Sequence, residues 1–302
     1  MIDFRSLEVF YWVAQLGSFR RAAEKLNMTQ PSISARIAQL EHQLKVRLLE
    51  RGSGGAVLTP KGIDLLSYAE RLLTLRTDLV MAITDRAAVR GTVRVGASET
   101  IVHTWLSMLV RQVHETYPLV TLEIVVDISP NLRDQLVGSE LDVALLLGPV
   151  AAPRVRNTPL CEFPLCWMAS PSIALPAEPV ALADLARWPL ITYSRATRPY
   201  LQIADLFNRS DLPPVRLFGN SSLSSIVKMT VDGIGVCAIP TAVVAEELAS
   251  GKLRQIMTEA EAQLPPLVFT ASHLNTPDHA LAAAVATLAK SAADAWQSSG
   301  SP

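Results

Sequence analysis

The chain has 302 residues, 49% of them hydrophobic, which is enough for two or three domains that each bury a core. The formal net charge of −1 taken alone argues against a nucleic-acid-binding protein, yet residues 1–62 hold nine Lys or Arg against five Asp or Glu, whereas residues 91–302 hold fourteen against nineteen. The N-terminus has no basic segment followed by an apolar one, and the longest apolar run, 143–152, is too short to cross a bilayer, so we exclude secreted and membrane-spanning classes and expect a protein of the cytoplasm with no membrane partner.

Three short amphipathic helices are predicted in the first 44 residues. Each starts at a side chain suited to capping a helix N-terminus, namely Asp3, Ser18 or Thr29. The apolar residues of each helix recur at helical spacing, so each helix has one face to bury. These apolar residues are Leu7, Phe10 and Ala14 in the first helix, Phe19, Ala22, Ala23 and Leu26 in the second, and Ile33, Ile37, Leu40 and Leu44 in the third.

The opposite face of the third predicted helix carries small and polar side chains. Small side chains let a helix approach base edges closely, and polar ones around the helix N-terminus supply donors for bases or phosphates. On a basic segment, this pattern predicts a helix-turn-helix that binds DNA; the alternative is an ordinary pair of core helices. The residues of this helix that we expect to contact DNA are Gln30, Pro31, Ser32, Ser34 and Arg36.

Downstream, Gly-Ser-Gly-Gly at 52–55 separates two short apolar segments, which predicts a two-stranded wing with a flexible tip. Thr59 and Pro60 then start a helix of about 28 residues, roughly 40 Å long. Its stripe repeats every 3.5 residues over some three heptads, which favours pairing with a second copy of the chain over packing on its own domain. The stripe runs through Leu65, Ala69, Leu72, Arg76, Leu79 and Ile83, flanked by Leu66, Leu73 and Val80.

Four segments occur in a fixed order and spacing that is more restrictive than a general helix-turn-helix pattern. They are AAEKLNMTQPSIS at 22–34, LE at 40–41, LLER at 48–51 and LTPKG at 58–62. With them the whole chain resembles a LysR-type transcriptional regulator. The resemblance implies an all-α winged helix-turn-helix domain over 1–58, a linker helix over 59–90 that dimerises, and an effector-binding domain over 91–302. It also implies a DNA contact from Arg51 in the wing. The chain departs from the family at Gly54, where a basic residue is common, and at Ala35, where a larger polar side chain is common.

After Gly91 the pattern changes to alternating strands and helices. Strands at 92–97, 120–126 and 141–147 with helices at 101–116 and 132–137 form βαβαβ, hence a parallel sheet. A second α/β lobe has strands at 165–169, 190–193, 215–218 and 235–239 and helices at 182–186, 201–208 and 223–231; a strand at 267–271 then returns to the first lobe and a helix at 278–296 closes it. This α/β arrangement, with lobe I at 91–163 and 267–302 and lobe II at 164–266, resembles the type 2 periplasmic-binding-protein fold.

Ligands of open α/β sheets lie at strand C-termini, near helix N-termini with free N–H groups. The resemblance places the effector between the lobes, at polar residues of these loops, each of which could instead be a simple cap or turn residue. Hydroxyls and Arg195 suit a carboxylate effector, but Glu99 would repel an anion, so an amine-bearing or zwitterionic effector stays open. The expected effector residues are Ser98, Glu99, Thr100, Ser129, Thr192, Ser194, Arg195, Asn220 and Ser222.

Other chemistry finds little support in the sequence. Ser225 and Lys228 match S-x-x-K inside a predicted helix without companion motifs, and the five histidines show no metal-ligand spacing. The three cysteines, Cys161, Cys166 and Cys237, are few, as in a reducing compartment. Peroxide-sensing members of the family use a cysteine pair in this half of the chain, but Cys161 and Cys166 flank an apparent crossover strand and resemble buried small hydrophobes. We therefore predict no catalytic residue, no metal and no cofactor.

The expected function is that of a sequence-specific DNA-binding transcriptional regulator, not an enzyme, whose promoter binding is modulated by a small-molecule effector. The expected partners are double-stranded promoter DNA, the effector and a second copy of the chain through the linker helix; the resemblance alone implies a homotetramer. The alternative is a solute-binding protein of a transport system, which shares the two-lobed fold. Against it stand the absent signal segment and the basic helix-turn-helix.

Overall fold

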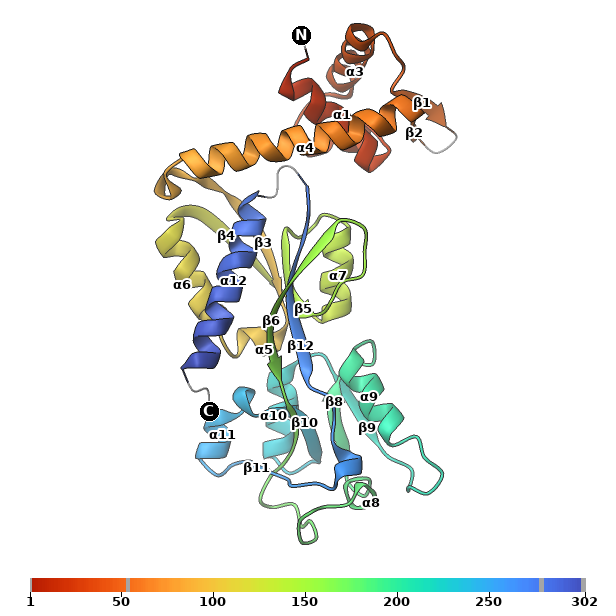
Figure 1. The fold of residues 1–302 in the computed structure, drawn as a ribbon. Helices are drawn as coiled ribbons and strands as arrows, with labels where there is room; N and C mark the ends of the chain where they lie inside the picture. The colour runs from red at the N-terminus through yellow and green to blue at the C-terminus, as the bar shows by residue number, and fades with distance from the viewer. Residues whose placement is uncertain (1, 53–54, 277–279, 300–302) are drawn as a thin grey trace. The chain divides into compact units, whose positions relative to one another are not determined.

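A computed structural model describes residues 2–52, 55–276 and 280–299. It divides into two compact units, Met1–Asp85 with Thr276–Ala280, and Arg86–Asn275 with Leu281–Pro302. We name them the N-terminal unit and the C-terminal unit and describe each by itself (Figure 1). Among the helices of the described residues, none has both the length and the apolar character needed to cross a membrane.

The N-terminal unit has three short helices, an antiparallel two-stranded wing and a long helix. The four predicted caps are confirmed: Asp3, Ser18, Thr29 and Thr59 each accept a hydrogen bond from the backbone N–H three residues later, which satisfies a donor that has no partner inside the helix. The elements are α1 (Phe4–Leu16), α2 (Phe19–Lys25), α3 (Gln30–Leu44), β1 (Leu49–Gly52), β2 (Gly55–Leu58) and α4 (Pro60–Ile83).

The wing is held to the helices by residues of the LE and LTPKG segments. The Glu41 carboxylate in α3 accepts hydrogen bonds from the N–H groups of Leu48 (2.7 Å) and Leu49 (3.2 Å) at the start of the wing. The N–H of Thr59 donates to the Leu48 carbonyl oxygen (3.0 Å). A Cβ atom at Gly62 would lie 2.1 Å from that same oxygen, so only glycine fits there. These motif residues therefore have structural roles.

Helix α4 buries only part of its apolar surface in its own unit. Ala69 and Leu73 are buried in the core, so the stripe that we predicted as a single pairing surface is divided. A second set of side chains is exposed and lies on one side of the helix, four or three residues apart. We name this set the exposed row; it consists of Tyr68, Leu72, Leu75, Leu79 and Ile83. The helix has 24 residues instead of the predicted 28 or so, because the backbone becomes extended at Thr84.

Lobe I of the C-terminal unit contains a five-stranded sheet in the order β4-β3-β5-β12-β6. The first three strands are parallel, as predicted, but the sheet as a whole is mixed, because β12 is antiparallel to both β5 and β6. The strands are β3 (Arg90–Ala97), β4 (Leu119–Val126), β5 (Val143–Leu147), β6 (Val155–Phe163) and β12 (Leu267–Leu274). The helices are α5 (Glu99–Val102), α6 (Leu106–Thr116), α7 (Ser129–Val137) and α12 (Ala280–Ser298).

Lobe II contains a second mixed sheet, in the order β11-β7-β10-β8-β9. Strands β10, β8 and β9 are parallel, and β7 runs antiparallel to β10 and β11. The strands are β7 (Leu165–Ala169), β8 (Leu190–Tyr193), β9 (Leu217–Asn220), β10 (Val236–Pro240) and β11 (Arg254–Gln255). The helices are α8 (Leu182–Leu185), α9 (Arg198–Leu206), α10 (Leu223–Val231) and α11 (Ala245–Ala249), and short 3-10 turns lie at Arg86–Ala88, Thr241–Val243 and Ala260–Ala262.

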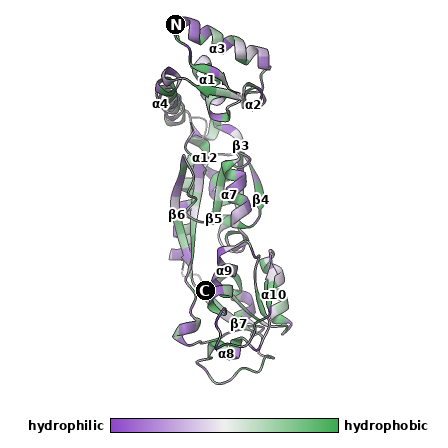
Figure 2. Cartoon of the chain, turned by 90° about the vertical axis from the view of Figure 1, so that its right-hand side faces the viewer, coloured by the Kyte–Doolittle hydropathy of each residue, from purple (hydrophilic) through white to green (hydrophobic). Residues whose placement is uncertain are grey.

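Several predicted boundaries need correction. The single helix expected at 101–116 is two helices, α5 and α6, separated by a turn in which Trp105 is fully buried. The sequence prediction omitted α11 and β11 and named β6 only as a crossover. Helix α9 begins earlier than predicted and β9 lies two residues later, while the predicted start of the closing helix, Asp278, lies outside the described residues. Figure 2 contrasts the uniformly hydrophobic β5 with the mixed α3.

Replacing Glu41 by Ala leaves two backbone N–H groups of the wing without their acceptor. Because such bonds to a charged group contribute about 1.5–3 kcal/mol, we expect the amides of Leu48 and Leu49 to exchange with deuterium tenfold or more faster in Glu41→Ala. Hydrogen–deuterium exchange mass spectrometry of the wing peptide measures this. Glu41→Gln keeps one acceptor oxygen and should change less, and Glu24→Ala, at an exposed carboxylate of α2, should leave wing exchange unchanged. Unaltered exchange in Glu41→Ala would contradict this role.

Candidate functional site

The N-terminal half of α3 presents the predicted DNA-contacting residues to solvent. Gln30, Pro31, Ser32 and Ser34 are exposed, whereas Ile33 in the same turns is buried. This alternation follows from the helical period, which places the apolar stripe of α3 against the core and the polar residues on the opposite side. The protein therefore has a helix face of small and polar side chains that is free to contact a partner.

The structure gives a less direct account of DNA contact for Arg36 and Arg51 than the sequence analysis expected. Arg36 is half-buried, and its Nη1 lies 3.9 Å from Oδ1 of Asp3, the cap of α1. The pKa of Asp3 is lowered, mainly by the backbone N–H of Ser6 and to a smaller extent by Arg36. Arg36 therefore also links α3 to α1. Arg51 lies in β1, but its side chain, like all of Gly54, lies outside the described residues.

A hollow of about 990 Å³ lies between α2, α3 and the wing. Gln30 and Ser34 line it, together with two basic residues that the sequence analysis did not single out, Arg20 and Arg47. Arg20 Nε pairs with the Glu24 carboxylate at 3.1 Å. The excess of basic residues in 1–62 was the available signal, but only the fold shows which of them share a surface with α3.

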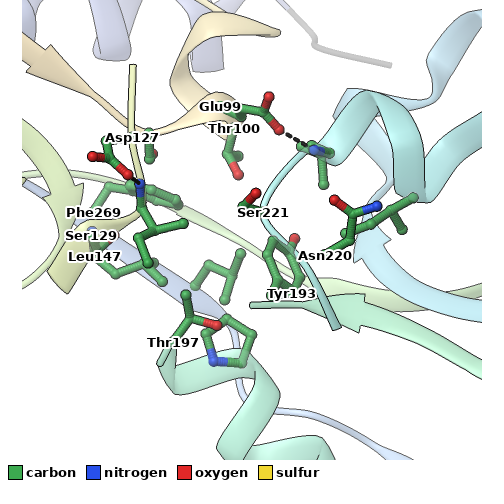
Figure 3. A pocket seen from close by; sticks show the side chains of 16 residues that line it. Glu99, Thr100, Asp127, Ser129, Leu147, Tyr193, Thr197, Asn220, Ser221 and Phe269 are labelled. Carbon is green, nitrogen blue, oxygen red and sulfur yellow. Dashed lines mark hydrogen bonds between the residues drawn. The ribbon is translucent and has the colours of Figure 1, made fainter. Parts of the chain in front are cut away.

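A pocket lies between the two lobes of the C-terminal unit, where the C-terminal ends of β3, β4, β8 and β9 converge (Figure 3). Its enclosed space is about 50 Å³, room for only a few water molecules. Lobe I lines it with Ser98, Glu99, Thr100, Asp127, Ile128, Ser129, Leu147, Leu267 and Phe269, and lobe II lines it with Tyr193, Thr197, Pro199, Asn220, Ser221, Leu223 and Ile226.

The pocket brings together some of the nine predicted effector residues and leaves others outside. Ser98, Glu99, Thr100, Ser129 and Asn220 line it. The remaining four lie outside its lining for separate reasons. Thr192 is fully buried in β8, Arg195 is exposed, Ser194 is half-buried in the loop between β8 and α9, and Ser222 caps α10 by accepting from the N–H of Ser225 (3.4 Å).

Sequence reasoning missed several residues that line the pocket. Asp127 directly follows β4 and Tyr193 ends β8, which are the strand C-termini that we used to choose the other residues. The apolar floor, Leu147, Ile226 and Phe269, comes from β5, α10 and β12. These residues appear as ordinary core positions in the sequence, and only the packing of the lobes shows that they face a pocket.

The side chain of Glu99 crosses from one lobe to the other. Its carboxylate accepts a hydrogen bond from the N–H of Leu223, the first residue of α10 (Figure 3). Nearby, Nε2 of His103 at the end of α5 lies 3.3 Å from the Ser224 hydroxyl oxygen. A carboxylate at a helix N-terminus is favoured because it meets unpaired N–H groups and the positive end of the helix dipole. This contact links lobe I to lobe II at the edge of the pocket.

Asp127 and Ser129 hold the opposite wall of the pocket. The Asp127 carboxylate accepts from the N–H of Ile128 (2.7 Å) and from Nδ2 of Asn131 (2.9 Å) at the N-terminus of α7. The Ser129 hydroxyl oxygen accepts from the N–H of Leu147 (3.0 Å). These bonds fix the loop after β4 against β5 and so give the wall a defined shape.

Two buried hydroxyls at the pocket lack a hydrogen bond of ordinary geometry. They are Oγ of Ser98, a residue with 9% exposure, and the phenol OH of Tyr193. Burial raises the pKa of Tyr193, and its neighbour Thr100 opposes this only in part, so the phenol stays protonated. Buried polar groups are normally paired, and these two are therefore available to a bound molecule.

The cysteines do not resemble reactive thiols. Cys161 and Cys237 are buried, and burial raises their pKa to about 11 and about 12; burial also raises the pKa of Cys166. Since the thiolate is the reactive form, these values disfavour a redox switch. In the described part of the chain, no group of three or more His, Cys, Asp or Glu is placed to hold a metal ion.

Two family models match the chain, one in each unit. Residues 4–63 match the bacterial regulatory helix-turn-helix protein, lysR family, and residues 86–293 match the LysR substrate binding domain. The second match alone spans more than half of the 302 residues. The matched segments contain the α3 face and the interlobe pocket.

Relatives that match most of the chain are transcriptional regulators. The chain is 30% identical to the HTH-type transcriptional regulator BbuR of Bordetella bronchiseptica, over 83% of this chain and 78% of that one. It is 26% identical to GltR of Bacillus subtilis over 84% of each. A solved structure of a Corynebacterium glutamicum OxyR C206 mutant is 25% identical, covers 99% of this chain and 95% of its own, and has a TM-score of 0.57. The chain therefore belongs to the LysR-type family of DNA-binding transcriptional regulators, which carry an effector-binding domain and are not enzymes.

Proposed function

We propose that the protein binds promoter DNA with the N-terminal half of α3 and that a small molecule in the interlobe pocket modulates this binding. The observation that carries the first part is the exposed polar face of α3, with Gln30 and Ser34 lining a hollow beside Arg20 and Arg47. A helix in the major groove uses such side chains on base edges while basic residues contact phosphates. A promoter-binding protein acts in the compartment that holds the DNA, the cytoplasm.

The pocket supports the second part of the proposal. Polar and apolar side chains of both lobes meet there, and Glu99 contacts α10 across it. A ligand that prefers one arrangement of the lobes shifts the population toward it and thereby alters the DNA-bound state. A solute-binding protein of a transport system accounts for the two lobes but not for the N-terminal unit with its exposed α3.

A second copy of the chain is the partner that the exposed row of α4 fits. Leu75, Leu79 and Ile83 are 66%, 57% and 77% exposed, and such a continuous apolar row on a helix is typical of a helix-pairing surface. Two-fold DNA sites require a two-fold protein. We therefore propose a dimer through α4; a tetramer through the C-terminal units remains an expectation from the family.

Replacing Gln30 by Ala should weaken binding to a specific duplex about tenfold or more, because a good bidentate contact to a base contributes about 1–3 kcal/mol. Fluorescence anisotropy with duplexes from the region upstream of the protein's own gene measures this. Gln39→Ala, at an exposed position of α3 outside the hollow, is the control and should bind like the wild type. Equal affinities for the two variants would contradict base contact by Gln30.

Replacing Arg47 by Ala should weaken binding to specific and unrelated duplexes alike. A lost phosphate contact lowers the slope of log affinity against log salt concentration by about one, so the same titration at several salt concentrations tests the role. Lys252→Ala, in the C-terminal unit, is the control and should keep the wild-type slope. An unchanged slope in Arg47→Ala would show that Arg47 does not contact the DNA. Salt-insensitive binding by the wild type would contradict the proposal that the protein is a DNA-binding regulator.

Replacing Leu75 by Glu should convert a dimer into a monomer at micromolar concentration, because it places a charge within the apolar surface that pairing would bury. Sedimentation velocity measures the assembly state. Ser67→Glu introduces the same side chain at an exposed position of α4 outside the exposed row and should leave the dimer intact. A dimer that persists in Leu75→Glu would show that the chains pair elsewhere.

A further inference from the structure

We propose that the effector carries a protonated nitrogen, held between the carboxylates of Glu99 and Asp127, with its uncharged part on the apolar floor of the pocket. This inference rests on the proposed function of the pocket as the effector site. It replaces the carboxylate that the sequence suggested, because Arg195, the one cation in that expectation, is exposed and outside the lining.

The charge of the pocket lining is acidic. It includes two carboxylates, and among the described residues that line it there is no Lys, Arg or His. The basic groups that flank the pocket are engaged elsewhere or face solvent: His103 lies against the Ser224 hydroxyl, Arg198 donates to the Gly148 carbonyl oxygen (3.4 Å), and Arg195 is exposed. An anion in the pocket would therefore meet like charges, whereas a cation would meet opposite ones.

Three backbone donors beside the pocket that would suit an anion already have acceptors within the protein. The N–H of Leu223 donates to Glu99, and the N–H of Ser222 donates to the Asn220 side chain (2.9 Å). On the other wall, the N–H of Ile128 donates to Asp127. An anionic ligand would have to displace these acceptors. A carboxylate accepts several hydrogen bonds, so Glu99 and Asp127 can receive further donors from a ligand without losing their present ones.

The unpaired hydroxyls add recognition beside the acidic pair. Ser98 Oγ lacks a hydrogen-bond partner, and the Tyr193 OH has only its neighbour Thr100, without a bond of ordinary geometry. A hydroxyl group accepts an N–H donor or donates to a ligand oxygen. Leu147, Ile226 and Phe269 offer apolar contact on the floor. The pocket is narrow, with a volume of about 50 Å³, so a ligand that enters fully favours lobes that are further apart. The Glu99 contact with α10 joins the lobes at the edge of the pocket. Binding is thereby coupled to lobe movement.

Matched pairs of compounds test the class of ligand on the full-length protein. Cadaverine and glutarate share a five-carbon skeleton, and benzylamine and benzoate share a ring, so within each pair the charged group is the main difference. We expect isothermal titration calorimetry to detect at least one amine at millimolar or tighter affinity, with the matching acid at least tenfold weaker. Acids that bind more tightly than their amines, or absence of binding by both amines up to ten millimolar or so, would overturn the proposal.

Variants then assign the binding to the acidic pair. Glu99→Gln keeps the shape of the side chain and an oxygen that can accept from Leu223, so the lobes stay joined, but amine affinity should fall about tenfold or more. Ser98→Ala removes a hydroxyl that has no partner and should weaken the amine without lowering the melting temperature of the unliganded protein. Glu115→Gln, at an exposed carboxylate of α6, is the control. Unchanged amine affinity in Glu99→Gln, with Glu115→Gln also unchanged, would overturn the assignment.

The same preparations separate this inference from the proposed function. Calorimetry needs no DNA, so it decides the class of ligand directly, whereas the duplex titration decides whether the protein is a DNA-binding regulator. Salt-sensitive DNA binding together with tighter binding of the acids would support the proposed function and contradict only the inference that the effector carries a protonated nitrogen. Amine binding that depends on Glu99 without any DNA binding would support the ligand class and contradict the regulator.

Discussion

The two lobes of the C-terminal unit meet across the pocket through a carboxylate on one and a helix N-terminus on the other. Glu99 accepts the N–H of Leu223, a group that α10 cannot satisfy within itself. The same side chain lines the pocket. It is therefore both part of the proposed ligand site and part of the contact between the lobes, so a ligand that interacts with Glu99 would also act on the arrangement of the lobes.

Carboxylates that accept backbone N–H groups organise the N-terminal unit as well. Asp3 caps α1 and Glu41 holds the start of the wing. These two of the five acids in residues 1–62 thus accept backbone N–H groups, and the face of α3 that carries Gln30 and Ser34 keeps its polar side chains exposed. The Glu41 bonds fix the start of the wing, whereas the exposure of the α3 face follows from the helical period. Several motif residues that carry the family resemblance, such as Glu41 and Gly62, thus stabilise the fold of the N-terminal unit.

Local interactions explain which parts of the fold could be predicted from the sequence. Caps such as Thr29 and Thr59 depend on residues three positions away, and strands such as β7 depend on an apolar run of five residues, so both were predicted. β12 pairs antiparallel with β5, and Asp127 lines the pocket. Both features depend on contacts between segments far apart in the sequence, which no local pattern encodes. Arg195 was chosen for its charge and its place after a strand, but the loop directs it to solvent.

The division of α4 into two apolar surfaces constrains how a ligand signal can reach DNA. Ala69 and Leu73 are buried in the core that α4 shares with α1 and α3, so that core joins α4 to α3. When the exposed row pairs with a second copy, as we propose, the spacing between the two α3 helices is fixed by that pairing. An effector in the pocket then has little scope to reshape α3 or its spacing within one dimer. Within this proposal, the effector acts on how the dimer as a whole meets the promoter, and not on the shape of the α3 face.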